Sequence, residues 1–543
     1  MFKESFSEDF VRQYRTIIED GNLSKERAEQ RALLEIKTIL QQHSYNLNTF
    51  SLPEISISPE LRLDDNSIRI EEYRLEAEIL CQKLNAAQRA AFDEIMNTTG
   101  SKCFFLDGPG GSGKTFLYNA IIKTIKGSGK DVLAFATTGI ASLLLEGGRT
   151  VHSGLKLPLD VNESSVAGIK PSSRQAEEIR KCEIIIIDEV TMMTVHILNC
   201  IDRLLKDVIQ DFNQPFGGKK ILIGGDFRQT LPIVPHATNP AEIIEICINR
   251  SSIWNHFKKL TLIDNMRLQT NSEFNEWLLK IGAGTTPAIA GLHSNMVEIP
   301  SSMICVGDLI SQIFGNFTDT DDLANRIILT ATNEMADKIN MRILGYLPGE
   351  ERTYRSIDTH IFEDEDENEQ AGIQVEFLNS LSTGGMPPHE LKLKLGSVVI
   401  LLRNLDHRKG LCNGTRLQIV RMQQKSITAK ILSGVNHGEL VCLPRINLTT
   451  KKGLYPFILK RKQFPIRLAY AMTINKSQGQ TFNAVGIHLN KRLFGHGQLY
   501  VALSRCRNPN NIKILIEEAD ITQGDVLKNG RHYITNIVYP GIV

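Results

Sequence analysis

The sequence lacks a marked excess of charge, a paired cysteine motif and a long apolar run. Lys and Arg number 62 and Asp and Glu 61, so the net charge is +1 and bulk charge indicates no polyanionic partner. None of the nine cysteines lies within a C-x-x-C, which argues against a disulfide scaffold or a zinc module. The longest apolar runs, such as Ile184–Ile187 and Val398–Leu402, are far shorter than the ~18 residues of a membrane span. We therefore expect neither zinc nor a membrane as a partner.

The sequence contains enough apolar residues to form several hydrophobic cores. The chain has 543 residues, of which 42% are hydrophobic, and at ~100–200 residues per domain this length predicts about three to five domains. The start, MFKESFSEDF, is too acidic and polar for a signal peptide. These features predict a soluble, intracellular protein, nuclear if its source is eukaryotic and with mitochondria as a second location.

Short apolar runs alternate with helical stretches in two parts of the chain. In the first part the runs are Cys103–Leu106, Val132–Ala136, Ile184–Ile187 and Ile221–Ile223. In the second they lie near Leu260–Ile263, Ile327–Thr330, Val485–His488 and Ile512–Ile516. Runs this short and rich in Ile, Val and Phe predict parallel strands covered by helices on both faces, which is an α/β fold.

Residues 391–450 differ in character from the sequence around them. Short strands are expected at Ser397–Leu402, Arg416–Val420, Ser426–Leu432 and Glu439–Leu443, with Gly, Asn and Asp turns between them. Close spacing of this kind is typical of an all-β unit. We expect a small β-barrel inserted into the second α/β part.

A glycine-rich segment, GPGGSGKT, follows the first apolar run and precedes a helical stretch at Phe116–Lys126. Its spacing, G-x-x-x-x-G-K-T, is that of a loop whose backbone N–H groups surround phosphate oxygens at a helix N-terminus. The Lys side chain then reaches the β and γ phosphates, and the Thr hydroxyl ligates Mg²⁺. The residues expected to bind the nucleotide are Gly108, Pro109, Gly110, Gly111, Ser112, Gly113, Lys114 and Thr115.

Two acids end the apolar run Ile184–Ile187. Carboxylates at the end of a buried strand are costly to desolvate unless a cation is bound there. We expect Asp188 to hold Mg²⁺ and Glu189 to accept a proton from the attacking water. Helix capping is the alternative for these acids, and the phosphate loop upstream makes it the weaker one. The two motifs predict an NTPase but do not choose among a GTPase, a kinase, an AAA-type motor and a helicase.

Four further segments narrow this choice. They are GGDFRQTLPIV at 224–234, NMR at 265–267, TINKSQGQT at 473–481 and YVALSRCR at 500–507. In this order after the NTP motifs they resemble the superfamily 1 helicases of the Pif-type, RecD-like branch. The resemblance covers roughly residues 84–520. It implies two RecA-like domains that bind ATP and Mg²⁺ between them and act on single-stranded and forked DNA, as a monomer.

The resemblance also implies roles for single residues. Gln229 senses the γ-phosphate from the first domain, and Arg267 and Arg505 reach it from the second as arginine fingers. A guanidinium is permanently cationic, so it stabilises the charge on the transferring phosphoryl group. Gln88 in LNAAQ resembles the adenine-reading glutamine, and its amide offers both a donor and an acceptor; an ordinary helix-face glutamine is the alternative.

A path for single-stranded DNA is expected on both domains. By resemblance the contacts are made by Thr137, Thr138, His152, Ser153, Lys476, Ser477 and Gln478, with Gly479 at the nucleotide. His152 as a structural histidine is an open alternative. The segment Lys451–Arg467 interleaves cations with Tyr455, Phe457 and Phe464, which is typical of single-strand binding, but a strand pair with a solvated basic face fits it equally well. By analogy, residues 155–182 form a wedge that splits the duplex.

Three stretches resemble the helicase part of Helitron rolling-circle transposons more narrowly: 347–358, 377–381 followed by 385–388, and 391–417. The N-terminal helical stretch and Leu52-Pro53-Glu54 fit the same source. The nicking domain of those proteins uses a His-apolar-His pair, and no His-x-His is present in this sequence. The predicted organisation has five parts: 1–66 helical extension and linker, 67–254 first RecA-like domain, 255–390 second domain, 391–464 inserted barrel and 465–543 second domain again.

The function predicted from this resemblance is an ATP-dependent 5′-to-3′ DNA helicase. Its roles would lie in DNA repair, recombination, telomere maintenance or transposon replication. Two alternatives stay open at this point: a helicase for RNA or RNA–DNA hybrids, and a non-catalytic DNA-binding remnant, which the intact motifs disfavour.

Overall fold

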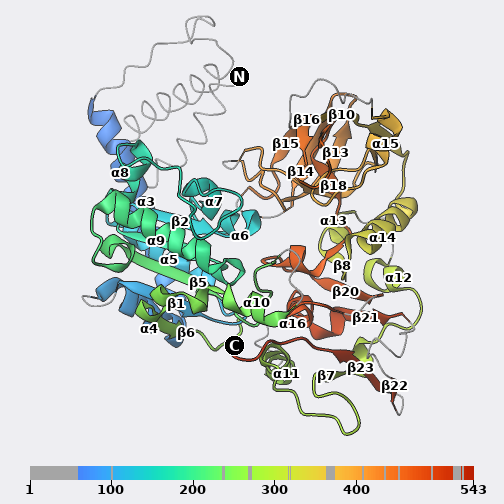
Figure 1. Ribbon diagram of the computed structural model, residues 1–543, viewed down its shortest axis with the longest axis horizontal. Coiled ribbons are helices and arrows are strands. Elements are labelled where there is room, and N and C mark those ends of the chain that lie inside the picture. The colour runs from blue at the N-terminus through green and yellow to red at the C-terminus, as the bar shows by residue number, and fades with distance from the viewer. Residues whose placement is uncertain are drawn as a thin grey trace, which may run out of the picture. The chain divides into compact units, whose positions relative to one another are not determined.

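The computed structural model describes residues 59–98, 102–234, 239–266, 272–315, 317, 320–362, 373–406, 409–432, 434, 436–450, 453–490, 493–517, 527–528 and 531–542. Figure 1 labels most of the helices and strands named below. The chain divides into two compact units: residues 1–84 with 120–131, and residues 85–119 with 132–543.

The smaller unit pairs one long helix with part of another. Helix α3 (Pro59–Gln82) lies along the second half of α5 (Lys114–Gly127), where Lys123 pairs with Glu76 and the Lys126 ammonium lies 4.9 Å from the Tyr73 ring centroid. The linker expected at 51–66 is therefore wrong from residue 59 onward, because Pro59 starts a helix as an N-terminal proline can. The helix expected within residues 1–50 lies outside the described residues.

The first sheet of the larger unit carries the phosphate-loop motif. Its six strands are parallel and run in the order β3-β2-β4-β5-β1-β6. The strands are β1 (Cys103–Asp107), β2 (Val132–Ala136), β3 (Arg149–Thr150), β4 (Ile184–Asp188), β5 (Lys220–Gly225) and β6 (Lys258–Thr261). The helices are α4 (Ala86–Asn97), the start of α5, α6 (Gly139–Leu143), α7 (Val151–Gly154), α8 (Arg174–Lys181), α9 (Val195–Ile209) and α10 (Pro240–Glu245). We call this part lobe 1.

Strand β6 corrects the expected boundary between the domains. It pairs in parallel with β1, through Phe105↔Lys259 and Leu106↔Leu260. The boundary at residue 254/255, and the assignment of Leu260–Ile263 to the second sheet, are therefore wrong. The physical reason is that a six-strand order is fixed by long-range pairing, which a local apolar pattern does not encode.

Lobe 2 contains a second parallel sheet in the order β19-β8-β20-β21 and a small antiparallel sheet, β22-β23-β7. The strands are β7 (Met296–Ile299), β8 (Arg326–Thr330), β19 (Ala471–Thr473), β20 (Ala484–Leu489), β21 (Ile512–Ile516), β22 (Leu527–Lys528) and β23 (Arg531–Thr535). The helices are α11 (Ser272–Ala283), α12 (Leu309–Phe314), α13 (Thr320–Leu323), α14 (Asn333–Tyr346) and α16 (Gln498–Leu503). The expected runs at 327–330, 485–488 and 512–516 are strands β8, β20 and β21.

Between α14 and β19 lies the segment that we call the β insertion, residues 352–468. It forms a five-stranded sheet, β15-β14-β13-β12-β18, a three-stranded sheet, β10-β17-β16, and the pair β11-β9. Its elements are β9 (Arg352–Arg355), β10 (Ile357–Ile361), α15 (Val375–Ser380), β11 (Glu390–Leu393), β12 (Val398–Leu401), β13 (Arg416–Met422), β14 (Ser426–Ile431), β15 (Leu440–Pro444), β16 (Ile446–Thr449), β17 (Ile458–Gln463) and β18 (Ile466–Leu468). It starts before the expected residue 391, because β9 and β10 pair with later strands.

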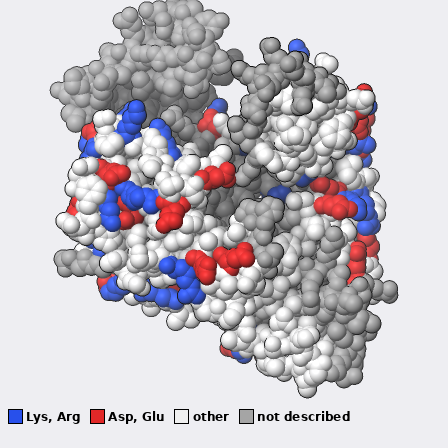
Figure 2. All heavy atoms as spheres, viewed as in Figure 1, with Lys and Arg blue, Asp and Glu red and all other residues white. Residues whose placement is uncertain are grey.

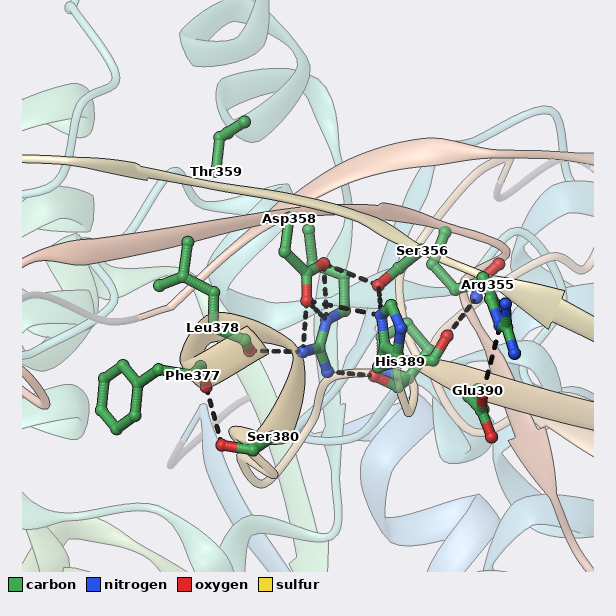
Figure 3. A network of polar contacts seen from close by, with 12 residues as sticks. Arg355, Ser356, Asp358, Thr359, Phe377, Leu378, Ser380, His389 and Glu390 are labelled. Carbon is green, nitrogen blue, oxygen red and sulfur yellow. Dashed lines mark hydrogen bonds and ion pairs between the residues drawn. The ribbon is translucent and has the colours of Figure 1, made fainter. Parts of the chain in front are cut away.

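Figure 3 shows the buried polar network that holds the β insertion together. The Arg461 guanidinium donates to both oxygens of Asp358, with Nη2 2.7 Å from Oδ2, and also to Pro387 O and Leu378 O. Ser356 Oγ donates to Asp358 Oδ1 at 2.6 Å. A buried carboxylate and guanidinium that satisfy each other in this way fix α15 against the sheet.

This network also corrects the stacking hypothesis for Lys451–Arg467. Arg461 is 1% exposed and Phe464 is fully buried, so neither reaches a DNA strand. Phe457 is buried in a small apolar cluster with Leu459. The alternative, a strand pair with a solvated basic face, holds for the strand but not for Arg461, which faces inward from β17. Arg467, at the end of the segment, lines the cleft described below. Lys451 and Lys452 lie outside the described residues.

Candidate functional site

The phosphate loop connects β1 to α5, as its motif requires. The Lys114 ammonium lies against the loop's own backbone, where it donates to Gly108 O and Pro109 O. Ser112 is buried and Thr115 is half-buried at the first turn of α5. Consecutive backbone N–H groups at a helix N-terminus, with a lysine among them, form the donor set that a polyphosphate takes.

Gln88 meets this loop from α4. Its side chain completes a capping box with Asn85, and its Nε2 donates to Ser112 O at 3.2 Å. Gln88 is 2% exposed, so it is not the exposed helix-face glutamine of the alternative interpretation. Its amide oxygen accepts from Asn85 N. The Gln88 side chain therefore links the start of α4 to the phosphate loop.

The two acids lie at the end of β4, next to the phosphate loop. Burial, and then the charge of Glu189, raise the pKa of Asp188 to about 7, while Lys114 opposes this shift. Glu189 adopts a left-handed backbone (φ 55°), and its Oε2 is buried without a hydrogen-bond partner. A raised carboxyl pKa and an unsatisfied carboxylate oxygen mark a site built for a cation or a reacting group rather than for stability.

Tyr118 and Gly224 complete the wall behind these acids. The pKa of the Tyr118 hydroxyl is raised well above its usual value by burial and by the nearby Asp188 and Glu189 carboxylates. A Cβ at Gly224 would lie 1.7 Å from the Tyr118 hydroxyl oxygen. Only glycine fits there, which explains the first glycine of the GGDFRQ motif.

Lobe 2 reaches the phosphate loop through α16 and the residues just after it. Arg505 is buried, and its guanidinium donates to Val501 O, Gln480 O and Ser504 Oγ. A Cβ at Gly110 would lie 3.5 Å from Arg505 Nη2, so the guanidinium borders the loop. Burial lowers the pKa of Arg505, and Glu189 is the first of the charges that oppose this shift.

Tyr500 and Asp226 meet beside the phosphate loop, a contact that the sequence motifs do not single out. The Tyr500 hydroxyl accepts from Gly110 N (3.1 Å) and donates to Asp226 Oδ2 (2.8 Å), so one phenol bridges the phosphate loop and the end of β5. Asp226 also accepts from Arg228 Nη1 at 2.9 Å. Both residues stand inside quoted motifs, but their meeting depends on a separation of 274 residues that no local pattern reveals.

The second lobe contacts the GGDFRQ loop at two more points. His496 Nδ1 accepts from Tyr539 N, and its Nε2 lies 2.8 Å from Phe227 O, so the ring is neutral with the proton on Nε2. Gln478 Nε2 approaches Gln229 Oε1 at 3.5 Å. The predicted sensor Gln229 thus lies in the interface between the lobes.

Arg267 itself lies outside the described residues. Met266, just before it, donates its backbone N–H to Gly111 O, and Asn265 Nδ2 donates to Gly110 O. This segment follows β6 of the first sheet. That Arg267 reaches the γ-phosphate from the second domain as an arginine finger stays a prediction.

A cleft of about 520 Å³ holds most of the residues expected to bind DNA. Both lobes and the β insertion line it. Its predicted members are Thr137, Thr138, His152, Lys476 and Gln478. Burial lowers the pKa of His152, which keeps the ring neutral. Lys476 and Arg467 flank Asp337, with Arg467 Nη2 3.3 Å from its Oδ2.

Ser153, Ser477 and Gly479, the other residues predicted at the DNA or the nucleotide, do not line this cleft. Ser477 is fully buried and its hydroxyl donates to Ile474 O, so the prediction that it contacts DNA is wrong for its side chain. Ser153 is exposed but does not line the cleft. Gly479 lies between Ser477 and Gln480, whose carbonyls accept from Arg505.

Two of the hydroxyls in the cleft have structural partners. Thr137 Oγ1 donates to Glu189 O at 2.8 Å, and Thr138 Oγ1 accepts from Ala141 N as the N-cap of α6. Thr137 therefore joins the cleft wall to the backbone of Glu189. The loop 476–480 makes a matching link in lobe 2, because it lines the cleft and also holds Arg505.

No helix within the described ranges has the length and apolar character needed to cross a bilayer. Among those same residues, His, Cys, Asp and Glu form no group of three or more that could hold a metal ion.

The chain matches known helicases in both sequence and structure. Residues 83–290 match the family model of the PIF1-like helicases, and residues 376–422 match that of the 2B domain of DNA helicase Pif1. The ATP-dependent DNA helicase PIF1 of Xenopus laevis is 27% identical over 442 residues, which cover 78% of this chain and 60% of that protein. The chain thus spans about three fifths of the length of such curated relatives.

Two solved structures of Pif1 helicases are also similar to this chain. The chain of Bacteroides Pif1 bound to ssDNA is 26% identical, with a TM-score of 0.58, 81% of this chain covered and 93% of that chain. Pif1 from Bacteroides in complex with ADP-AlF3 and ssDNA is 27% identical, also with a TM-score of 0.58, and the match covers 81% and 94% of the two chains.

Proposed function

Since the chain belongs to the Pif-type helicases, we propose that it is an ATP-driven DNA helicase that moves along one strand and separates the duplex, in the 5′-to-3′ direction. The observation that supports this most directly is the contact of α16 in lobe 2 with the phosphate loop of lobe 1. Tyr500 bonds to Gly110 N, and Arg505 borders the same glycine. Chemistry at this loop is thereby tied to the relative position of the two lobes.

The residues of the site fit ATP and Mg²⁺. The phosphate loop and Lys114 would hold the triphosphate, and Thr115 with Asp188 would hold the cation. The unsatisfied Glu189 oxygen and the raised pKa of Asp188 are the observations that support this fit. Bound Mg²⁺ supplies charge neutralisation at the β and γ phosphates.

The chain's own residues then have separate tasks. Glu189 takes the proton of the attacking water. Gln229 lies against Asp226 and Gln478, and Arg505 borders Gly110 of the phosphate loop. Arg505 stabilises the charge that develops on the transferring group. Because Arg505 is held by carbonyls of the loop 476–480, a shift of that loop moves the guanidinium.

Movement along DNA follows from the cleft that both lobes line. Thr137 joins this cleft to Glu189, and the loop 476–480, whose Lys476 and Gln478 line the cleft, holds Arg505 through its carbonyls. Opening and closing of the lobes therefore changes the grip on a strand and the catalytic geometry together. We expect one polarity and a dependence of ATP turnover on DNA.

A strand-separation assay tests the proposal. Duplexes with a 5′ tail and with a 3′ tail, each prepared as DNA and as RNA, are incubated with and without ATP and Mg²⁺. We expect separation of the 5′-tailed DNA only, and only with ATP. Separation of the RNA duplexes instead would favour the RNA helicase, and DNA binding without any ATP turnover would establish a non-catalytic remnant.

A further inference from the structure

An open groove of about 770 Å³ lies on the β insertion, and none of the residues that line it also lines the cleft. Strands β9 and β11 form one side of it. Its lining carries four cations and one carboxylate: Arg352, Arg355, Lys392, Arg445 and Glu390. On the face of the molecule that Figure 2 shows, Lys and Arg are interspersed with Asp and Glu.

Two of these cations are already neutralised. Arg355 pairs with Glu390 at 3.2 Å, an ion pair that Figure 3 draws, and Lys392 pairs with Glu351 at 3.7 Å. Both pairs involve exposed side chains, so their mutual attraction is weak and a stronger anion can compete with it.

The other two cations have no carboxylate partner among the residues that the structure describes. Arg352 donates to Met422 O at 2.8 Å and Arg445 donates to Arg355 O at 2.6 Å. Arg445 also lies over two rings, 5.0 Å from the centroid of Phe464 and 5.8 Å from that of Tyr354. These contacts fix both guanidinium groups in place while they leave most of their N–H donors open.

The ligand that suits such donors is a phosphate diester. A guanidinium binds phosphate oxygens in a bidentate manner, and two fixed guanidiniums in one groove match a repeating phosphate backbone. Single strands are bound mainly by stacking of bases on exposed rings. The only ring that lines this groove within the described part of the chain, Tyr354, is 6% exposed, so a strand whose bases are already stacked in a duplex is favoured.

We propose that this groove is a second DNA site, which binds the phosphate backbone of duplex DNA outside the strand-separating cleft. The inference rests on the proposed function in taking DNA as the polyanion. The groove would hold the duplex while the cleft pulls one of its strands. The protein would then stay at the junction between duplex and single strand as it moves.

The test uses the full chain, a blunt duplex of about 20 base pairs and a short oligothymidylate, with binding followed by fluorescence anisotropy over a salt series. The double variant Arg352→Ala with Arg445→Ala is expected to bind the duplex at least about fivefold more weakly. The slope of log affinity against log salt should fall by about 2, one for each phosphate that is no longer neutralised. Oligothymidylate binding and the ATPase that it stimulates should stay unchanged.

Three further proteins complete the experiment. Arg352→Lys with Arg445→Lys keeps the charges and should keep most of the salt slope. Arg531→Ala with Lys338→Ala removes two exposed cations that pair with Glu298 and Glu334 elsewhere, and should leave duplex binding unchanged. Glu390→Gln frees Arg355 and should tighten duplex binding about twofold to threefold, a gain that misfolding cannot produce.

Two results overturn the proposal. In the first, the alanine double variant and Glu390→Gln both bind the duplex with the affinity and the salt slope of the parent protein. In the second, the alanine double variant loses affinity for the duplex and for oligothymidylate equally, because the groove would then belong to the single-strand path. Absence of ATP turnover in the parent protein would contradict the proposed helicase function. The duplex measurement would still decide whether the groove binds duplex DNA.

Discussion

The Tyr500 hydroxyl donates to Asp226 Oδ2 at 2.8 Å while it accepts from Gly110 N at 3.1 Å. One phenol of lobe 2 thus satisfies a carboxylate and a phosphate-loop N–H of lobe 1. Burial and the charge of Asp226 raise the pKa of Tyr500 well above its usual value, so the hydroxyl keeps its proton and remains a donor at neutral pH.

Replacement of this tyrosine by phenylalanine is expected to weaken the interface between the lobes. Tyr500→Phe leaves a buried carboxylate without one of its donors, which costs about 1–3 kcal/mol. We expect the urea-unfolding midpoint to fall and DNA-stimulated ATP turnover to drop about tenfold. Tyr455→Phe, which changes a ring that stacks on Phe457 within the β insertion, serves as the control and should leave both measurements unchanged.

Loss of the proposed base should separate nucleotide binding from hydrolysis. Glu189→Gln keeps the size of the side chain and removes its basicity, so turnover should fall by about 10²–10⁴ while ATP still binds. Lys114→Ala should lose ATP turnover with DNA binding largely kept. Normal hydrolysis by the Glu189 variant would show that the base is elsewhere, and normal hydrolysis by the Lys114 variant would remove the phosphate-loop assignment.

The guanidinium geometry of Arg505 is expected to be essential. Arg505→Lys keeps the charge but loses the planar fork that contacts Gln480 O and Ser504 Oγ. Single-turnover ATP hydrolysis should slow by about 10³ or more, with the nucleotide dissociation constant within about threefold of the parent value. Turnover at the parent rate would exclude Arg505 as a finger.

Asp337 is a carboxylate in the cleft that we assign to a DNA strand. It pairs with Arg467, and burial is the main cause of its raised pKa. Asp337→Asn removes a charge that repels phosphate, so single-strand affinity should rise about threefold. Asp308→Asn makes the same change at the Arg342 ion pair outside the cleft and should have no effect.

His496 predicts a pH dependence of the lobe interface. Burial lowers its pKa below the usual 6.5, because both ring nitrogens already have neutral backbone partners. Below pH 6.5 the unfolded chain takes up a proton that the folded chain refuses, so the free energy of unfolding falls as the pH drops toward the lowered pKa. Denaturant unfolding between pH 7 and 5 measures this slope, which His496→Asn should reduce and His437→Asn should not.

How much can be predicted from the sequence depends on the range of each interaction. The phosphate loop and the acids at 188–189 are local motifs, and their strand, loop and helix context follows from a short window. The local pattern assigns strand β6 to the wrong sheet because its partner β1 lies about 150 residues earlier in the chain. The closeness to Helitron helicases stays a prediction.

Side-chain direction is the other limit. The pattern of cations and rings in Lys451–Arg467 is the same whether these groups face a nucleic acid or a core. Only the pairing of β17 with β10 brings Arg461 to Asp358. Tyr500 and Asp226 escape prediction for the same reason, since nothing in either motif indicates that one reaches the other.

The Arg461–Asp358 pair has a consequence for how this protein can change over evolutionary time. Loss of either partner alone leaves a buried charge unpaired and costs about 3–5 kcal/mol, whereas joint replacement by apolar residues is close to neutral. The two positions are therefore expected to mutate together or not at all. Related chains should show either both ionic residues or neither, which makes this pair a marker of common descent for the β insertion.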